Sequence, residues 1–211
     1  MSKKPTGLTL SKALDGWRRN DGVAAVEFAL VAPVAIALFG LLAIWAQGIA
    51  IQRKVTLAAR TITDLVTQQG TQTSNCSASV NQSAVDNLLN NAANVLYPYV
   101  KPNSGSNPVT GTNVSNMTMV VSEINVDASG TTATVQWSEP MPSHGTALPT
   151  TAHGVSLPAS VGSAGPNLIM GTVTYAYTPP VIGEAVGTIT LHDTIYLSIR
   201  QWCSLALNVG Q

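Results

Sequence analysis

Charged and aromatic side chains are both scarce in this 211-residue chain. Charged residues make up 9% of it and aromatic residues 5%, and ten bases and ten acids cancel to a formal net charge of zero. An ordinary soluble domain carries about 25% charged residues. Nucleic-acid-binding proteins need a basic surface, so nucleic acid is excluded as a partner. The 45% of hydrophobic residues exclude a disordered charged tail.

The chain also lacks the motifs that carry catalysis or metal binding. His144, His153 and His192 show no metal-ligand spacing with Cys, Asp or Glu. His192 and Asp193 are neighbours on an expected strand and point to opposite faces, so they cannot form a relay. No nucleophile elbow, P-loop or dinucleotide fingerprint is present. We therefore expect no enzyme activity, no cofactor and no metal, and an exported hydrolase is the weakest function considered.

Only two cysteines are present, Cys76 and Cys203. Residues 71–211 contain just eight charged side chains and are rich in Ser, Thr, Asn, Gly and Pro, a composition typical of exported bacterial proteins. An even cysteine count in an exported chain predicts one disulfide. A disulfide between the two cysteines would close a loop of more than 100 residues, which would contribute about 4–5 kcal/mol to stability in the chain-entropy model. Two buried free thiols are the alternative.

The few charges are unevenly distributed. Residues 1–22 hold five bases and two acids, a net charge of +3, whereas residues 23–211 hold five bases and eight acids, a net charge of −3. No charged side chain occurs from Phe28 to Ile51. A helix over this run would be about 36 Å long, enough to cross a bilayer. Bases predominate before the run, so the positive-inside rule favours a cytoplasmic N-terminus.

Glu27 lies at the cytoplasmic edge of this apolar run. A carboxylate there costs a few kcal/mol unless it is paired or reaches the interface. Two interpretations follow: Glu27 has a function within the membrane, or its side chain extends to the lipid headgroups.

Three other interpretations of the segment compete with a functional glutamate. A signal peptide could be cleaved after Ala50, but the apolar run is long for one. A twin-arginine signal could include Arg18 and Arg19, but the usual apolar continuation is missing. An uncleaved signal anchor is the strongest competitor, and it predicts a mature chain that retains Met1.

The residues around Glu27 resemble a type IV prepilin cleavage site. A basic leader ends at Gly22, Glu27 is the fifth residue after it, and Phe28 and an apolar stretch with Pro33 follow. Within that superfamily, residues 21–33 (Asp-Gly-Val-Ala-Ala-Val-Glu-Phe-Ala-Leu-Val-Ala-Pro) are similar to the TadE-like minor pseudopilins of tight-adherence (Tad) pilus systems. Major pilins of that system typically have Tyr after the glutamate and are far shorter. Beyond these residues the similarity is weaker and rests on a helix-then-strands plan and on the runs 175–179 and 195–200.

This resemblance implies a mechanism of processing and assembly. A prepilin peptidase would remove residues 1–22 by cutting between Gly22 and Val23. Val23 would become the N-terminus, and Glu27, followed by Phe28, would face the amine of a neighbouring subunit during assembly. The implied partners are the peptidase, other pilin or pseudopilin subunits, the inner-membrane assembly platform and the membrane itself.

The resemblance also implies a location and a role. The chain would be a single-pass inner-membrane protein with its head in the periplasm, or outside the cell as part of a pilus for surface adherence. The second hypothesis, from another class, is an uncleaved single-pass membrane protein with a periplasmic binding or adhesive domain.

The rest of the chain predicts an α+β, type IV pilin-like fold. One long helix is expected over residues 23–70, transmembrane over about 28–51 and amphipathic beyond, because apolar residues recur at three- and four-residue spacing up to Gly70. Residues 71–211 would form the head. A polar loop is expected over 71–81 and a short second helix over 83–96.

Alternating apolar residues predict a mostly antiparallel sheet packed on the long helix. A phase shift between Val121 and Ile124 indicates a bulge in its first strand. Residues 140–167 contain five prolines and are expected to form one long loop. The expected strands cover residues 117–126, 133–137, 169–177 and 188–200.

Overall fold

The computed structural model describes residues 21–100, 116–141, 155–161, 166–180 and 183–208. The leader up to residue 20, most of the expected 140–167 loop, His144 and His153 lie outside these residues. The chain divides between Ala46 and Gln47 into two compact units. The second unit runs from Gln47 onward, so it contains the expected head (71–211) together with the second part of the long helix. Below, the word head means this whole unit.

Helix α2 (Asp21–Thr67) contributes to both units and is the long apolar helix that the sequence predicts. Within the head, its apolar stripe faces the core, where Ile51, Val55 and Ile62 are at most 1% exposed. The helix gives way to turn hydrogen bonds over residues 65–69. Gly70 follows with φ of +133°, a conformation that disfavours side-chain-bearing residues, so glycine is suited to this stop.

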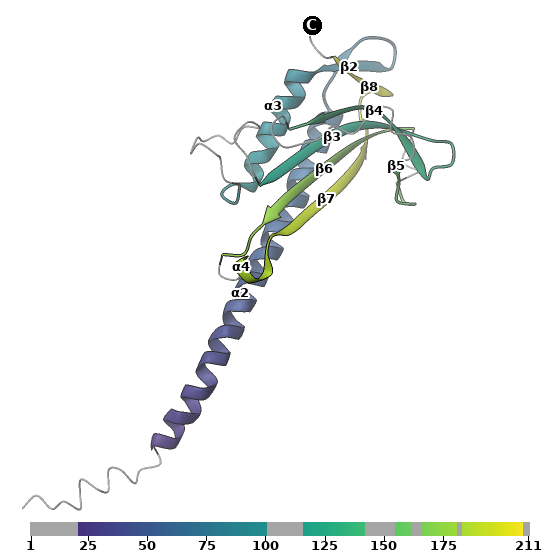
Figure 1. Ribbon diagram of the computed structural model, residues 1–211. Helices are drawn as coiled ribbons and strands as arrows, with labels where there is room; N and C mark the ends of the chain where they lie inside the picture. The colour runs from purple at the N-terminus through teal and green to yellow at the C-terminus, as the bar shows by residue number, and fades with distance from the viewer. Residues whose placement is uncertain (1–20, 101–115, 142–154, 162–165, 181–182, 209–211) are drawn as a thin grey trace, which may run out of the picture. The chain divides into compact units, whose positions relative to one another are not determined.

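The main sheet of the head has five antiparallel strands in the order β5-β4-β3-β6-β7. The register between β3 and β4 shifts at Glu123/Ile124, which confirms the predicted bulge. Figure 1 shows β3, β6 and β7 side by side, with the second half of α2 behind them. The strands are β3 (Met117–Val126), β4 (Thr132–Pro140), β5 (Val155–Ser156), β6 (Asn167–Tyr177) and β7 (Ile189–Ser198).

A second sheet corrects the loop expected over residues 71–81. It has the order β1-β2-β8, formed by β1 (Thr71–Gln72), β2 (Ser77–Asn81) and β8 (Ser204–Asn208), and β2 and β8 are parallel. Strand β2 was not recognised in the sequence because it is mostly polar: only Ala78 and Val80 are buried. The loop expected over 140–167 is also wrong in part, because β5 pairs there with β4.

Three short helical segments complete the described elements. Helix α3 (Gln82–Ala93) continues into the 3-10 helix η2 (Asn94–Leu96), and together they form the expected second helix. Helix α3 contacts β2 and β4. Helix α4 (Gly183–Val186) lies in the connection between β6 and β7 and was not expected.

Apolar side chains fill both faces of the main sheet. Alternate residues of β6 point to opposite faces of the sheet. On one face, Ile169 and Val173 belong to a large core that includes α2. On the other, Leu168 and Met170 belong to a smaller core with Leu157. The expected packing of a long helix on one face of an antiparallel sheet is therefore present within the head.

Gly171 on β6 marks the closest approach of this sheet to α2. A Cβ atom there would lie 3.3 Å from both Ala59 O and Thr63 Cβ and would overlap the Thr63 hydroxyl. That hydroxyl already donates to Ala59 O at 2.6 Å. Glycine is therefore required by the spacing between helix and sheet.

We expect Gly171→Ala to lower the free energy of unfolding of the head by about 1–3 kcal/mol, because overpacking forces the helix and sheet apart. Denaturant unfolding followed by circular dichroism in detergent measures it. Gly48→Ala is the matched control, since its Cβ would meet Tyr177 at an ordinary 3.8 Å. Adding Thr63→Ala to Gly171→Ala should recover part of the loss. Equal effects of Gly171→Ala and Gly48→Ala would contradict this interpretation.

Candidate functional site

The first two turns of α2 contain the residues that the sequence singles out for processing and assembly. Gly22, Val23, Glu27 and Phe28 are all helical and all exposed. Val23 and Glu27 are four residues apart, so they lie on one face of the helix. The structure therefore places the expected new N-terminus and the glutamate one helical turn apart.

Gly22 has no packing role among the described residues. A Cβ atom added there would meet no atom within 4 Å. A helical glycine costs roughly 0.5–1 kcal/mol relative to alanine. Among the described residues, therefore, neither close packing nor a positive φ requires glycine at position 22.

The apolar surface that follows is large and uncovered by the described chain. Phe28, Leu30 and Phe39 are 73–75% exposed, and no side chain from residue 22 to residue 50 is buried. By length and composition, this helix can cross a membrane. Exposed apolar surfaces of this size are typical of membrane or protein contacts.

Glu27 is the single acidic side chain in this exposed apolar part of α2. Among the residues that the structure describes, the one ion pair joins Asp64 and Arg200, at 2.5 Å, and Glu27 has no cationic partner. A carboxylate in an apolar medium needs a cation or hydrogen-bond donors. The arrangement thus leaves Glu27 available to a cation from another chain.

A disulfide joins Cys76 and Cys203, as the cysteine count predicts. It connects the segment before β2 to the segment before β8, and Cys203 N–H also donates to Cys76 O at 2.6 Å. Because β2 and β8 then run in parallel from this point, the disulfide and the backbone bond fix their register.

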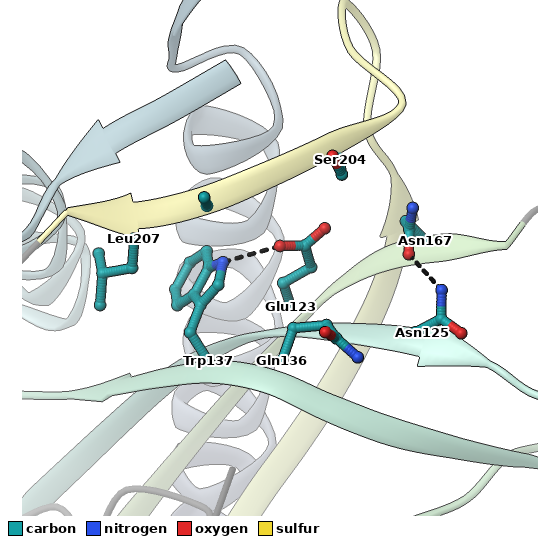
Figure 2. A pocket seen from close by; sticks show the side chains of 8 residues that line it. Glu123, Asn125, Gln136, Trp137, Asn167, Ser204 and Leu207 are labelled. Carbon is teal, nitrogen blue, oxygen red and sulfur yellow. Dashed lines mark hydrogen bonds between the residues drawn. The ribbon is translucent and has the colours of Figure 1, made fainter. Parts of the chain in front are cut away.

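A second candidate site is a pocket of about 480 Å³ in the head, between β8 and the main sheet. Figure 2 shows its polar side chains rising from β3, β4 and β6 toward β8. Two asparagines bond to each other across its floor, at 2.7 Å, and Asn167 Nδ2 also donates to Cys203 O. The pocket is lined by Glu123, Asn125, Gln136, Trp137, Asn167, Ser204, Ala206 and Leu207.

Glu123 and Trp137 hold the edge of β8 as a neighbouring strand would. The backbone N–H of Leu205 donates to Glu123 Oε1 at 3.1 Å, and the Trp137 indole N–H donates to both Leu205 O and Glu123 Oε2. Glu123 and Trp137 are partners in the β3–β4 register, directly before the bulge, and their side chains lie on the face that β8 covers. The pair therefore satisfies both polar groups of a buried backbone residue.

Burial dominates the electrostatics of this contact. It raises the pKa of the Glu123 carboxyl above its ordinary value, and the bonds from Leu205 and Trp137 offset part of the rise. Within the described residues no nucleophile and base are paired here, and no group of three His, Cys, Asp or Glu side chains could hold a metal. The geometry thus assigns Glu123 and Trp137 to docking β8.

Sequence reasoning missed Glu123 as a site residue. The available signal was an acid within an apolar strand, at the position where the alternation changes phase. Its partner Leu205 is 82 residues away, so no local pattern connects them.

Two further acids lie near each other at α3: Glu139 of β4, which is buried, and Asp86 of α3, which is half-buried. Glu139 accepts from Gln82 Nε2 at 3.1 Å on both carboxylate oxygens. Burial raises the pKa of both carboxyls, and the charge of Asp86 further raises that of Glu139. Asp86 Oδ1 is buried without a donor among the described residues.

These raised pKa values predict how stability depends on pH. The folded head binds protons at Glu123, Glu139 and Asp86 more readily than the unfolded chain does. This contribution is complete below the unfolded pKa values and is lost as the pH rises through the folded ones. We therefore expect the Tm of the head to rise when the pH is lowered from 7 to about 5.

Thermal unfolding across that pH range tests this expectation. Glu123→Gln should reduce the pH dependence, because it removes one of the titrating groups, whereas the exposed Glu184→Gln should leave it unchanged. A Tm that falls steadily from pH 7 to pH 5 in the unmodified chain would show that other groups control the acid response.

Comparison with known proteins adds no identification. No protein-family description, curated protein or solved structure matches this chain.

Proposed function

We propose that this chain is a TadE-like minor pseudopilin that is cleaved after Gly22 and takes part in assembling a Tad-type pilus for surface adherence. The observation that supports this proposal most directly is the spacing of Gly22, Glu27 and Phe28 at the start of an exposed apolar helix. A peptidase would recognise Gly22 and release Val23 as the new N-terminus. The head would then lie on the periplasmic side of the inner membrane, or outside the cell within a pilus.

The physical argument concerns charge in an apolar medium. A buried ammonium and a buried carboxylate are each costly alone, and pairing offsets part of that cost. The freed amine of Val23 supplies the cation that Glu27 lacks. Pairing between neighbouring subunits therefore favours those packed in the correct register, and the apolar surface of residues 28–50 supplies the contact area between them.

Removal of the leader also changes how the helix is held. Residues 1–22 carry a net charge of +3, which keeps the N-terminus on the cytoplasmic side. Cleavage removes these charges, so extraction of the helix from the bilayer into an assembly costs less.

Mass spectrometry of the N-terminus of membrane-purified protein tests the proposal, in cells that also express the prepilin peptidase of the same genome. We expect the mature chain to begin at Val23. A chain that begins at Met1 would instead be an uncleaved anchor for the head, and one that begins at Ile51 would be the product of a signal peptidase. Either result would overturn the proposal.

A further inference from the structure

The head meets the apolar run at a defined depth along α2. The run covers Phe28 to Ile51, and about 20 apolar residues fill the hydrocarbon core of a bilayer. Residues 28–47 would fill it, and residues 48–51 would then lie at the level of the lipid headgroups. Gln47, the one strongly polar residue of the run, is also the first residue of the head.

Part of the main sheet contacts α2 at this same depth. The Tyr177 hydroxyl, at the end of β6, donates to Gln47 Oε1 at 3.3 Å. A Cβ on Gly48 would lie 3.8 Å from the Tyr177 ring. The end of β6, and Ile189 of β7 that pairs with Tyr177, therefore lie beside residues 47–48 of α2.

Residues 183–189 expose apolar side chains. Val186 in α4 is 56% exposed, and Ile189, which pairs with Tyr177 in the register of β6 and β7, is 42% exposed. Hairpin connections that face water are ordinarily polar. Within the described head, Ile49 is also exposed at this depth, whereas Leu57 is the one large aliphatic residue exposed elsewhere.

Cations and tyrosines lie just beyond the apolar run of α2. Arg53 and Lys54 follow the apolar run directly, and Lys54 Nζ donates to Tyr97 O at 2.8 Å and lies 5.1 Å from the centre of the Tyr99 ring. Tyr97 is 49% exposed. Tyrosine rings and basic side chains are the residues that favour the headgroup region of a membrane.

We infer that residues 183–189, at the start of β7, form a second membrane contact, in which Val186 and Ile189 insert at the headgroup level of the bilayer that α2 crosses. The partner is a phospholipid surface, chosen because covalent continuity with the apolar run brings this patch to it. The inference rests on the membrane insertion of α2 that the proposed function also requires, but not on cleavage. Such a contact would limit the tilt of the head before assembly.

Spin labelling of the full chain in phosphatidylcholine–phosphatidylglycerol vesicles tests this inference. Both native cysteines are in the disulfide, so Val186→Cys provides a single free thiol for a nitroxide. The measured quantity is the collision rate of the nitroxide with oxygen divided by its collision rate with a water-soluble nickel complex. We expect this ratio to be several-fold higher for the label at residue 186 than for a label on Ser129→Cys. Ser129 follows the last residues of β3, and these pair with the start of β6, whereas Tyr177 is at the other end of β6. Ile189→Cys repeats the measurement on β7.

Labelled Leu38→Cys, within the apolar run, separates the outcomes. If residue 38 is in lipid but residues 186 and 189 are as accessible to nickel as residue 129, the second contact is wrong and the membrane span stands. If residue 38 is accessible to nickel, α2 does not span, and both proposals fail. If residue 186 is in lipid, but mass spectrometry in peptidase-expressing cells finds Met1 retained, the contact stands and the pseudopilin proposal fails.

Discussion

Replacing Gly22 with valine is expected to leave the chain as an uncut precursor that begins at Met1. A peptidase must bring its catalytic groups against the backbone carbonyl of the residue before the cut, and a glycine lets them approach closely. A branched Cβ would obstruct that approach. We expect the mature fraction to fall from nearly complete to undetectable, as measured by N-terminal mass spectrometry and by gel mobility.

The chain offers a matched control for this prediction. Gly40 lies on the same helix, and a Cβ there also meets no atom within 4 Å. Gly40→Val therefore makes the same change in helix propensity and apolar volume, and should leave cleavage after Gly22 intact. If both variants were processed normally, Gly22 would not be the recognised residue. If both were blocked, the defect would lie in membrane insertion.

The long helix and the main sheet could be predicted because their signals are local. Helical spacing of Val55, Ala58 and Ile62 reports one buried face of α2. The alternation in β7, which only Asp193 breaks, reports a strand within ten residues. The bulge was also visible, since an inserted residue shifts the alternation at a single place.

The second sheet could not be predicted for a different reason. Strands β2 and β8 come from opposite ends of the head in sequence, and each is only five residues long, with small or polar residues at most positions. Their pairing depends on the disulfide and on the side chains of Glu123 and Trp137, which bond to Leu205 from 82 and 68 residues away. Contacts of this kind leave no local pattern in a single sequence.

The candidate site at the start of α2 has the opposite character. Its signal is a fixed spacing of glycine, glutamate and phenylalanine, which the sequence alone displays. The structure adds that Gly22 has no packing role and that Glu27 has no cationic partner among the described residues. Within the described residues, therefore, the fold of the chain does not explain why glycine and glutamate stand at these two positions.

Substitution of Glu27 by alanine is expected to abolish incorporation into the assembly while leaving cleavage after Gly22 nearly unchanged. In the proposed contact, the carboxylate faces the ammonium of Val23 on a neighbouring subunit. Removing one partner of a buried ion pair costs about 3–5 kcal/mol, since the other charge is left unpaired. That cost corresponds to a reduction of roughly a hundred-fold or more in the incorporated fraction.

Immunoblots of sheared pili and of membranes, with N-terminal mass spectrometry of the retained chain, separate assembly from processing. Glu27→Gln preserves the size and polarity of the side chain but removes its charge, so it should fail nearly as fully as alanine if charge pairing is the cause. Glu184→Gln, a change at an exposed acid of the head, is the matched control. Normal incorporation of Glu27→Gln would contradict charge pairing and indicate that Glu27 merely extends to the headgroups. An equal loss of cleavage would instead place Glu27 in recognition by the peptidase.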